Sequence, residues 1–323
     1  NASAVPTDSS FNFYKEHITK RLISTIILAQ LTFLHADNYS LSFDGSDDYV
    51  SVNGTVIDNV FSGTNSLTVS VWVYGDGGGN DGVTRTIISK GNANGGNPRT
   101  FQIFKEHEGS LSYVLYSDSN SNWIRAQVGN GSLNSTGWNH ILVTYNGGTS
   151  YTSLTLNING YSLSFTGYNY QGYSGMNSNS DPMYVGARVT TDGSTHDLWN
   201  NKIDELGIWN EALTSSEITA LYNSGLGLDP SSNNGDYTSS SNLQGYWNFN
   251  EGTGTTASDA TSNSNDGTIN GATWSTDVPP TSGGSGGGDN CPLTLTVSNP
   301  PAGSTYDVYQ NLTISWSSTT PAG

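Results

Sequence analysis

The chain has 323 residues, of which only 11% are charged, and its formal net charge is −17 at pH 7. Its 39 glycines, 8 tryptophans and 18 tyrosines suit an all-β protein with many polar turns, and they exclude a helical bundle, which needs more Ala, Leu, Glu and Lys. Nucleic-acid binding requires clustered Lys and Arg, and no basic run follows residue 21, so we expect no nucleic-acid partner.

The N-terminal part has the order of a secretory signal. In residues 15–36, KEHITKRLISTIILAQLTFLHA, basic residues precede an apolar run from Leu22 to Leu34, and Ala36 offers a small residue before a cut. This order predicts an upstream segment and signal peptide over residues 1–36, with a buried helix as the alternative. The run is too short to span a bilayer comfortably. We therefore expect a secreted or cell-surface protein with no membrane insertion after signal cleavage.

Residues 37–275 contain a succession of strand patterns separated by turn residues. The patterns, in chain order, are YSLSF, LTVSVWVY, FQIF, LSYVLY, WIRAQV, GWNHILVTY, MYVGAR and KIDELGIW. LTLNINGYSLSF predicts a hairpin around Asn159–Gly160, because Asn-Gly fits a two-residue turn. No β-α-β alternation interrupts the series, so it predicts a two-sheet antiparallel sandwich.

One helix is expected, in EALTSSEITALYNSG. Thr214 and Glu217 have the spacing of a capping box, and Ile218, Leu221 and Tyr222 share one apolar face. The glycine that follows ends the helix. A single amphipathic helix beside a sandwich predicts a lid on one edge or end of a sheet.

The C-terminal part changes in composition. Residues 276–290, TDVPPTSGGSGGGDN, predict a flexible Gly/Ser linker. Residues 291–323 contain the lone cysteine, Cys291, which excludes an intrachain disulfide, and two alternating stretches, LTLTV and LTISW. These stretches predict the first strands of a truncated Ig-like domain.

Several of these segments together resemble a laminin-G-like domain of the concanavalin A-like superfamily. They are LSFDGSDDYVSV, SLTVSVWVY, TIISKGN, GWNHILVTYNG, LTLNINGYSLSF, MYVGAR and KIDELGIWNEALTSSEITALYNSG. The resemblance covers about residues 39–226. It implies a jelly-roll sandwich of two antiparallel sheets with one short capping helix.

Residues 243–274 also resemble this family, but in an unusual place. Such a Y-W-x-F…N-G-x-I segment normally precedes the L-x-F-D-G strand, whereas here it follows the helix, so the domain resembles a circular permutation. We expect Tyr246–Phe249 to add a strand and Gly267–Trp274 to pair next to Tyr39–Phe43. The alternative is the start of a second, truncated copy.

Asp204, Glu205 and Glu211 are the most suggestive catalytic candidates. The resemblance extends to glucanases that carry Glu, Asp and Glu at alternate strand positions, which places carboxylates on one face of a sheet. Here Lys202 stands at the first of these positions, and a leucine or a glycine stands at the third. Neighbouring residues of a regular strand point to opposite faces, so we do not expect Asp204 and Glu205 to flank one bond. The set predicts no catalytic residues.

The other side chains of this strand have simpler expected roles. Leu206 and Ile208 should face the core, with Asp204 at the end of their row, where it accepts hydrogen bonds or binds a metal ion. Trp209 is either a packing residue or a sugar platform. His140, in GWNHILVTY, is most simply a hydrogen-bonded strand residue.

Three turns are rich in the oxygen donors that Ca²⁺ prefers. The resemblance implies that jelly rolls of this kind often carry a Ca²⁺ ion, and a permuted domain could bring these turns together. Plain Asx turns are the alternative. The candidate ligands are Asp44, Asp204, Asp259, Asn263, Asn265 and Asp266.

Sugar binding requires exposed aromatic faces with polar neighbours. Gly- and Asn-rich loops supply most of the candidates, and packing is the alternative for each. The candidates are Trp123, Arg125, Tyr168, Tyr170, Tyr173 and Trp199.

These features together predict a non-catalytic extracellular binding module within a larger secreted protein. Its expected partner is an extracellular polysaccharide or a surface protein, with carbohydrate recognition or adhesion as its role and Ca²⁺ as its candidate cofactor. One alternative is a structural or adhesive spacer. Another is a glycan hydrolase or lyase whose catalytic residues do not match a known pattern.

Overall fold

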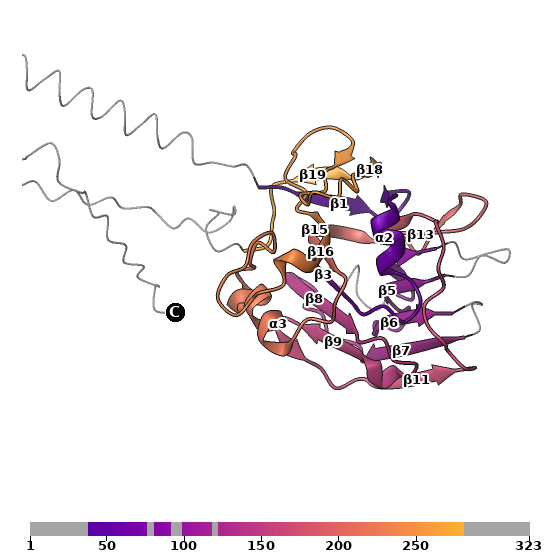
Figure 1. The fold of residues 1–323 in the computed structure, drawn as a ribbon. Coiled ribbons are helices and arrows are strands. Elements are labelled where there is room, and N and C mark those ends of the chain that lie inside the picture. The colour runs from indigo at the N-terminus through magenta and orange to yellow at the C-terminus, as the bar shows by residue number, and fades with distance from the viewer. Residues whose placement is uncertain (1–37, 76–80, 92–98, 118–121, 281–323) are drawn as a thin grey trace, which may run out of the picture. The chain divides into compact units, whose positions relative to one another are not determined.

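The computed structural model describes residues 38–75, 81–91, 99–117 and 122–280. They form two large antiparallel sheets with few helices, which confirms the expected all-β jelly-roll sandwich (Figure 1). The predictions for residues 1–36, for most of the linker and for the Ig-like segment lie outside the described residues. No helix in the described part has the length and apolar character that crossing a bilayer requires.

The first sheet has eight strands. Strand β15 is central, because β3 lies along one side of it while β1 and β16 share the other side. In spatial order the strands are β10 (Tyr161–Ser162), β9 (Leu154–Ile158), β8 (Trp138–Tyr145), β3 (Leu67–Tyr74), β15 (Asn200–Trp209), β1 (Ser40–Asp44) and β19 (Thr273–Ser275), with β16 (Leu243–Trp247) paired to β15.

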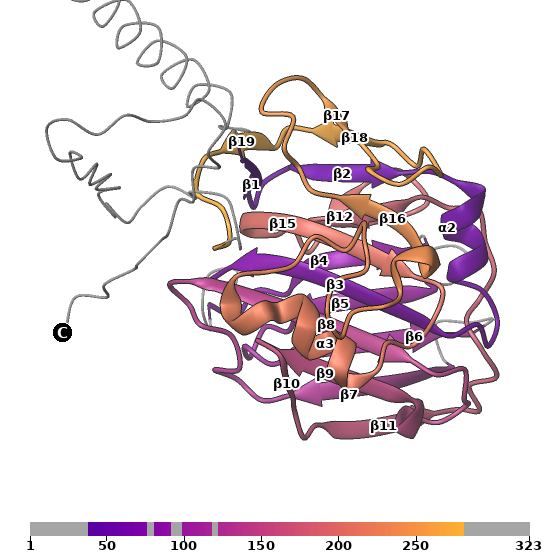
Figure 2. The same ribbon diagram turned by 60° about the vertical axis from the view of Figure 1, so that its left-hand side comes forward.

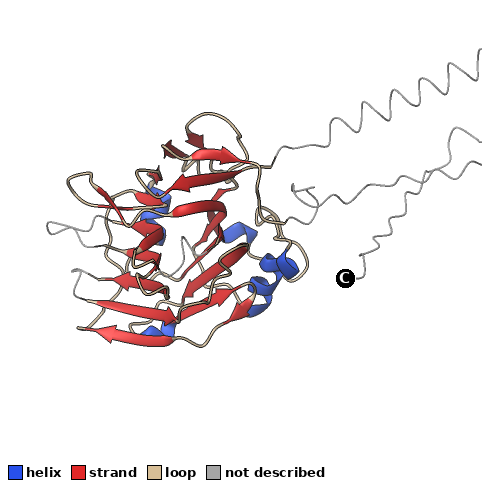
Figure 3. Ribbon diagram, turned by 180° about the vertical axis from the view of Figure 1, so that it is seen from behind, coloured by secondary structure: helices blue, strands red, loops and turns tan. Residues whose placement is uncertain are grey.

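The second sheet has nine strands and packs against the first (Figure 3). Its spatial order is β11 (Thr166–Tyr170), β7 (Trp123–Val128), β6 (Leu111–Tyr116), β5 (Phe101–Lys105), β4 (Arg85–Lys90), β12 (Met183–Val185), β2 (Tyr49–Val52), β18 (Gly267–Asn270) and β17 (Thr256–Ala257). A separate short ribbon pairs β13 (Arg188–Val189) with β14 (Thr195–His196).

The main core lies between the two sheets and follows from strand alternation. Val69, Val71 and Val73 of β3 alternate with more polar positions and are fully buried in it, as are Leu206 and Ile208 of β15. The last two confirm the predicted core row. The Asn-Gly hairpin is also confirmed: both turn residues have positive φ and join β9 to β10.

Helix α3 (Ser215–Tyr222) lies over the outer face of the eight-stranded sheet (Figure 2). A second apolar cluster lies between the helix and the sheet. Leu221 of the helix packs there with Leu142 and Trp209 of the sheet. The helix therefore covers a sheet face, whereas the sequence predicted a lid on an edge or end. The capping box at Thr214 and Glu217 is present as predicted.

The remaining helical segments are short. The sequence did not indicate α2 (Thr55–Val60), which buries Ile57 and Val60. The single-turn 3₁₀ helices are η1 (Tyr151–Ser153), η2 (Asn223–Gly225) and η3 (Ser240–Asn242).

The C-terminal strands pair only in part as the resemblance implied: Gly267–Asn270 forms β18, which pairs with β2 of the other sheet and not with β1. β16 adds to the central strand β15, and β19 pairs with β1, with Trp274 opposite Leu41. The permutation itself stays a prediction. The chain remains packed beyond the predicted start of the linker, because Val278 is buried and the Asp277 carbonyl accepts a hydrogen bond from the Ser40 hydroxyl at 2.8 Å.

Candidate functional site

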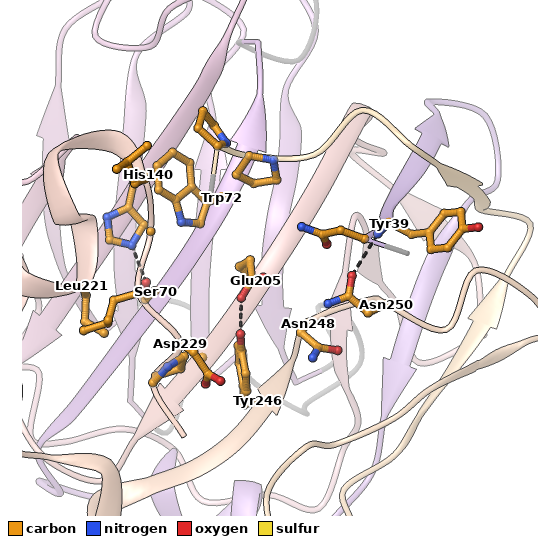
Figure 4. Close-up of a pocket in the computed structure, with 18 of the residues that line it drawn as sticks. Tyr39, Ser70, Trp72, His140, Glu205, Leu221, Asp229, Tyr246, Asn248 and Asn250 are labelled. Carbon is orange, nitrogen blue, oxygen red and sulfur yellow. Dashed lines mark hydrogen bonds between the residues drawn. The ribbon is translucent and has the colours of Figure 1, made fainter. Parts of the chain in front are cut away.

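A pocket of about 810 Å³ lies on the outer face of the eight-stranded sheet (Figure 4). Its floor comes from four adjacent strands, and the strand register puts the floor residues on the sheet face opposite the main core. The floor side chains are Ser70 and Trp72 of β3, His140 of β8, Glu205 and Trp209 of β15, and Tyr246 of β16.

The walls of the pocket come from segments that follow or precede the sheet strands. One wall is Leu221 of α3 with residues 226–230, and another is the loop at residues 248–253. Residues 38–39 and 279–280 complete the lining. The Asn250 side chain accepts a hydrogen bond from the Tyr39 backbone N–H at 2.9 Å, which ties two of these segments together.

A β-bulge in β15 points two neighbouring carboxylates to the same side of the sheet. Asp204 pairs with Trp72 and Gly207 pairs with Ser70. Two residues of β15, Glu205 and Leu206, therefore lie opposite the single β3 residue Val71. Glu205 takes a left-handed φ of 52°. The prediction that Asp204 and Glu205 face opposite sides was therefore wrong, and Asp204 does not belong to the core row.

Glu205 is held in the pocket by Tyr246, whose hydroxyl donates a hydrogen bond to the carboxylate (Figure 4). The pKa of Glu205 is raised to about 7, mainly by burial and to a lesser extent by the charge of Asp229, against the opposing effect of the Tyr246 hydrogen bond. Burial and the charge of Glu205 hold the pKa of Tyr246 well above its usual range. The Glu205 carboxyl therefore titrates close to neutral pH.

Asp204 is 0% exposed and incompletely hydrogen-bonded. Its Oδ1 accepts from the Glu205 backbone N–H at 2.9 Å, whereas its Oδ2 has no partner among the described residues. Burial raises the pKa of Asp204, and the charges of Glu205 and Glu251 raise it further. Glu251 accepts from the Ser258 N–H at 2.7 Å, but its other oxygen, Oε2, is also buried without a partner in the described part of the chain.

The aromatic side of the pocket is built around Trp72. Its ring stacks on His140 at 4.9 Å and on Tyr222 at 6.0 Å, centroid to centroid. His140 Nε2 shares a hydrogen bond of 2.6 Å with the Ser70 hydroxyl, and its Nδ1 has no partner in the described structure. Burial lowers the pKa of His140 to about 3, so the ring is neutral at pH 7. The predicted hydrogen-bonded role is thus met at one ring nitrogen only.

Trp209 is a packing residue. It is buried in the cluster beneath α3, and its indole N–H donates to the Tyr237 hydroxyl at 2.9 Å. A Cβ at Gly207 would come within 2.6 Å of the Trp209 ring, so this glycine gives the ring room to lie along the strand. Of the two roles left open by the sequence, packing is confirmed.

Four of the six predicted sugar-binding residues meet at the β11 edge of the nine-stranded sheet. Tyr170 stacks on Trp123 with centroids 5.1 Å apart, and the Arg125 guanidinium lies 5.2 Å from the centre of the Tyr168 ring. Tyr168 and Tyr170 are 41% and 44% exposed. Each ring has one face covered by its neighbour on β7, so only the outward face of each remains available.

The other two predicted sugar-binding residues are internal. Trp199 and Tyr173 are only 0% and 5% exposed, and both lie in the main core. Trp199 immediately precedes β15, and its backbone N–H donates to the Gly186 carbonyl at 2.7 Å. Tyr173 packs edge-on against Tyr145. Their prediction as ligand contacts is wrong, because polar neighbours in sequence do not show that an aromatic side chain is exposed.

The predicted calcium ligands do not form one cluster in the described structure. The Asp259 carboxylate already accepts hydrogen bonds from five donors: the N–H groups of Tyr246, Thr261 and Asn265, the Thr261 hydroxyl and the Asn265 amide. Asp266 in turn accepts from the Asp259 N–H. This is an Asx-type turn. It leaves Asp259 no free oxygen lone pair directed at a metal ion.

A different acidic turn keeps oxygen atoms close together. Ligand atoms of Asp44, Asp47 and Asp48 all lie within 4.8 Å of one another. Asp48 accepts from the Asp44 N–H, and Asp44 accepts from the Ser46 N–H, so part of this cluster is also a turn. Asn263 donates to the Gln244 carbonyl and lies in the Asp259 turn instead.

Sequence reasoning missed most of the pocket. Trp72 carried a usable signal, since it follows Thr68 and Ser70 on the polar side of an alternating strand. Asp229, Asn248 and Glu251 carried none, because they lie in irregular segments whose position depends on contacts far away in sequence.

Comparison with known proteins agrees with the fold. The family model described as the concanavalin A-like lectin/glucanases superfamily matches residues 44–219. A candidate carbohydrate binding protein from Bacteroides ovatus is similar in structure, with a TM-score of 0.52 and 21% identity over 76% of this chain; the chain spans 61% of that protein. No curated protein sequence gives a match.

Two further structures show weaker similarity. A heptameric SAP-like pentraxin from Limulus polyphemus has a TM-score of 0.34 and 14% identity, over 58% of this chain and 83% of the pentraxin. The NanB sialidase from Streptococcus pneumoniae has a TM-score of 0.42 and 17% identity, over 56% of this chain and 27% of the sialidase. With the family model covering more than half of its length, this chain belongs to the concanavalin A-like lectin/glucanase superfamily.

Proposed function

We propose that the protein is a carbohydrate-binding module and that the pocket on the eight-stranded sheet is its binding site. The observation that carries this proposal is the pocket lining, in which convergent polar groups stand beside aromatic side chains whose exposed parts are small, since Trp72 and Tyr246 are each 4% exposed. A sugar ring offers an apolar face and a rim of hydroxyl groups, which such a lining complements. The volume of about 810 Å³ lies in the range of roughly 300–1,000 Å³ that is typical of ligand pockets.

The polar groups of the pocket have the geometry of recognition. Asn248 and Asn250 come from the loop after β16, Asp229 comes from the segment after α3, and Glu205 rises from the floor (Figure 4). They therefore approach a ligand from different sides, as orientation-specific binding requires.

We propose binding without cleavage. A retaining glycosidase needs two carboxyl groups on opposite sides of the scissile bond, both able to reach the sugar. Asp204 stands beside Glu205 but is fully buried, and one of its oxygens is bound to backbone. Lys202 occupies the preceding position on the same face, and its ammonium pairs with Asp277 at 3.0 Å. These features favour a binding role over a hydrolase.

The setting of the module is also part of the proposal. The signal-like order of residues 15–36 supports secretion, and an extracellular polysaccharide or surface protein is then the natural partner. Calcium, if used, is best placed at Asp44, Asp47 and Asp48, whose oxygens are already close. That turn is separate from the pocket residues, so we expect calcium to affect stability more than affinity.

The test is depletion of the purified protein from solution by a panel of insoluble polysaccharides, in Ca²⁺ and in EDTA. At least one polysaccharide should deplete it. Asn248→Ala should weaken that binding about fivefold through loss of one hydrogen bond, on the order of 1 kcal/mol. Asn270→Ala, a similarly half-buried asparagine outside the pocket, should leave binding unchanged.

Other outcomes of this experiment would redirect the proposal. If Tyr170→Ala removes binding while Asn248→Ala does not, the site is the β11 edge. Release of reducing ends from the bound polysaccharide would show a hydrolase. No depletion by any polysaccharide, with the protein folded, would favour the spacer role.

A further inference from the structure

We propose that the pocket selects sugars that carry a free amino group, and that the ammonium is the feature it recognises. This proposal rests on the proposed carbohydrate-binding function and names the class of sugar. The ligand would be a glycan of glucosamine type with unacetylated amino groups, in preference to its N-acetylated form and to uronic acids.

The first argument is the sign of the charges around the pocket. Three acidic side chains, Glu205, Asp229 and Glu251, line it, and no lysine or arginine of the described chain does. His140 is neutral at pH 7 because burial lowers its pKa. A protonated amino group gains from the carboxylates of Asp229 and Glu251, and its approach favours ionisation of Glu205, which the raised pKa of about 7 otherwise keeps largely protonated at pH 6. The carboxylate of a uronic acid would be repelled.

The second argument is independent of charge count and concerns incomplete hydrogen bonding. Asp204 Oδ2, Glu251 Oε2 and His140 Nδ1 are buried, and none has a partner among the described residues. His140 and Glu251 line the pocket, whereas Asp204 is fully buried opposite Trp72 and does not belong to the lining. Buried acceptors without donors are costly, and an ammonium supplies three donors at one point, which suits Glu251 Oε2 and His140 Nδ1 in the lining.

The nearest cation of the same strand does not fill this role. Lys202 lies two residues before Asp204, but its ammonium pairs with Asp277 at 3.0 Å and lies 4.3 Å from the centre of the Tyr74 ring. It is thus directed to the far end of β15 and does not line the pocket. The acidic groups are left for a ligand.

A calcium ion fits the pocket less well than an organic cation. Calcium gathers six to eight oxygens at about 2.3–2.6 Å. Within the described residues, the acidic clusters whose ligand atoms lie within 4.8 Å of one another do not include Asp204, Glu205, Asp229 or Glu251. Carboxylates that surround a space without converging on one point suit a sugar that presents an ammonium and several hydroxyl donors.

The test is calorimetric titration of the full chain with three oligosaccharides of equal length, at pH 6 and about 150 mM salt to screen surface attraction. The probes are a glucosamine oligomer, an N-acetylglucosamine oligomer and a galacturonic acid oligomer. We expect the glucosamine oligomer to bind at least tenfold more tightly than the N-acetylated one, and the galacturonic acid oligomer not to bind.

Two matched variants distinguish ligand attraction by the pocket from general attraction by the acidic surface of the protein. Asp229→Asn keeps the oxygen that accepts from the Ser231 N–H but removes the charge, and should weaken the glucosamine oligomer about tenfold while leaving the N-acetylated oligomer unchanged. Asp236→Asn removes an exposed charge outside the pocket and should change neither.

Each contrary result has a distinct meaning. Equal or tighter binding of the N-acetylated or acidic oligomer overturns the amino-sugar proposal and leaves carbohydrate binding intact. Equal effects of Asp229→Asn and Asp236→Asn overturn it too, because the attraction would then be general. Failure of all three oligomers, together with every polysaccharide of the depletion panel, removes the proposed function itself.

Discussion

At the scale of single residues, the bulge at Glu205 decides what the pocket can do. In a regular strand its carboxyl and that of Asp204 would lie on opposite faces, and an alternation pattern predicts only that regular case. The extra residue is not visible in the letters KIDELGIW, because a bulge depends on the partner strand. Leu206 and Ile208 were predicted correctly, since the regular alternation of buried positions resumes after Glu205.

The pKa of Glu205 makes stability depend on pH in a defined direction. Burial raises it from about 4.5 to about 7 in the folded protein, where Asp204, Asp229 and Tyr246 are its charged or titratable neighbours. Between these values the folded protein holds a proton that the unfolded chain has lost. Stability therefore falls as pH rises through this window.

Glu205→Gln should remove this dependence, because the amide stays uncharged and still accepts from Tyr246. Between pH 5 and pH 8 the free energy of unfolding of the unmodified protein should fall by up to about 3 kcal/mol more than that of the variant. Urea unfolding at the two pH values measures the difference. Parallel pH profiles for the two proteins would contradict the assignment of this titration to Glu205.

At the scale of elements, the carboxylate of Glu217 connects the start of helix α3 to a later segment of the chain through hydrogen bonds. Glu217 accepts from the N–H and hydroxyl of Thr214 at the helix start, at 3.0 and 2.8 Å. Its other oxygen accepts from the Ser239 hydroxyl at 2.6 Å and from Thr238. The capping box was predictable from a local spacing, whereas the contact with Ser239, 22 residues later, was not.

Glu217→Ala should destabilise the protein by about 3 kcal/mol, because it removes a cap and leaves the buried Ser239 hydroxyl and the donors of Thr238 without this acceptor. Thr214→Ala, which affects the cap alone, should cost only about 1 kcal/mol. Both are measured by urea unfolding at pH 7. Equal losses in the two variants would show that the Ser239 and Thr238 contacts contribute nothing.

The contribution of Glu217 to stability should also depend on pH. These hydrogen bonds lower the pKa of Glu217 to about 2, although its burial acts in the opposite direction. The contribution of Glu217 to the free energy of unfolding is therefore complete above the ordinary glutamate pKa of about 4.5, and it is lost as pH falls toward 2. The difference in stability between the unmodified protein and Glu217→Ala should accordingly shrink at acidic pH.

At the scale of the whole molecule, the sequence predicted the sandwich well and the pocket poorly. Strand patterns are local, so alternation and turn residues were enough to place β1, β3, β8, β15 and the Asn-Gly hairpin. Most of the pocket floor comes from within residues 44–219, whereas Tyr246 of the floor and the wall residues lie before or after that family match. No local pattern shows which distant loops meet over a sheet.

The arrangement of the ends gives the predicted permutation a direct test. β19 pairs with β1 so that Ser275 lies opposite Ser40, and residues 38–39 and 279–280 line the same pocket. The end of the C-terminal segment therefore lies near the start of β1. Moving residues 233–280 in front of residue 38, through a short Gly/Ser linker, would restore the segment order that the resemblance implies.

We expect the rearranged chain to fold, because every strand pairing is kept and only the position of the chain ends changes. The new ends fall at residues 232 and 233, in an exposed stretch. Its free energy of unfolding should lie within about 2 kcal/mol of the original, since altering loop lengths costs little.

A chain that ends at residue 225 should fail to unfold cooperatively, because it lacks β16, β18 and β19 and the core residues Trp247 and Phe249. Urea unfolding followed by tryptophan fluorescence compares the three proteins. If the rearranged chain behaves like the shortened one, the segment depends on its present connection to α3, and the permutation is contradicted.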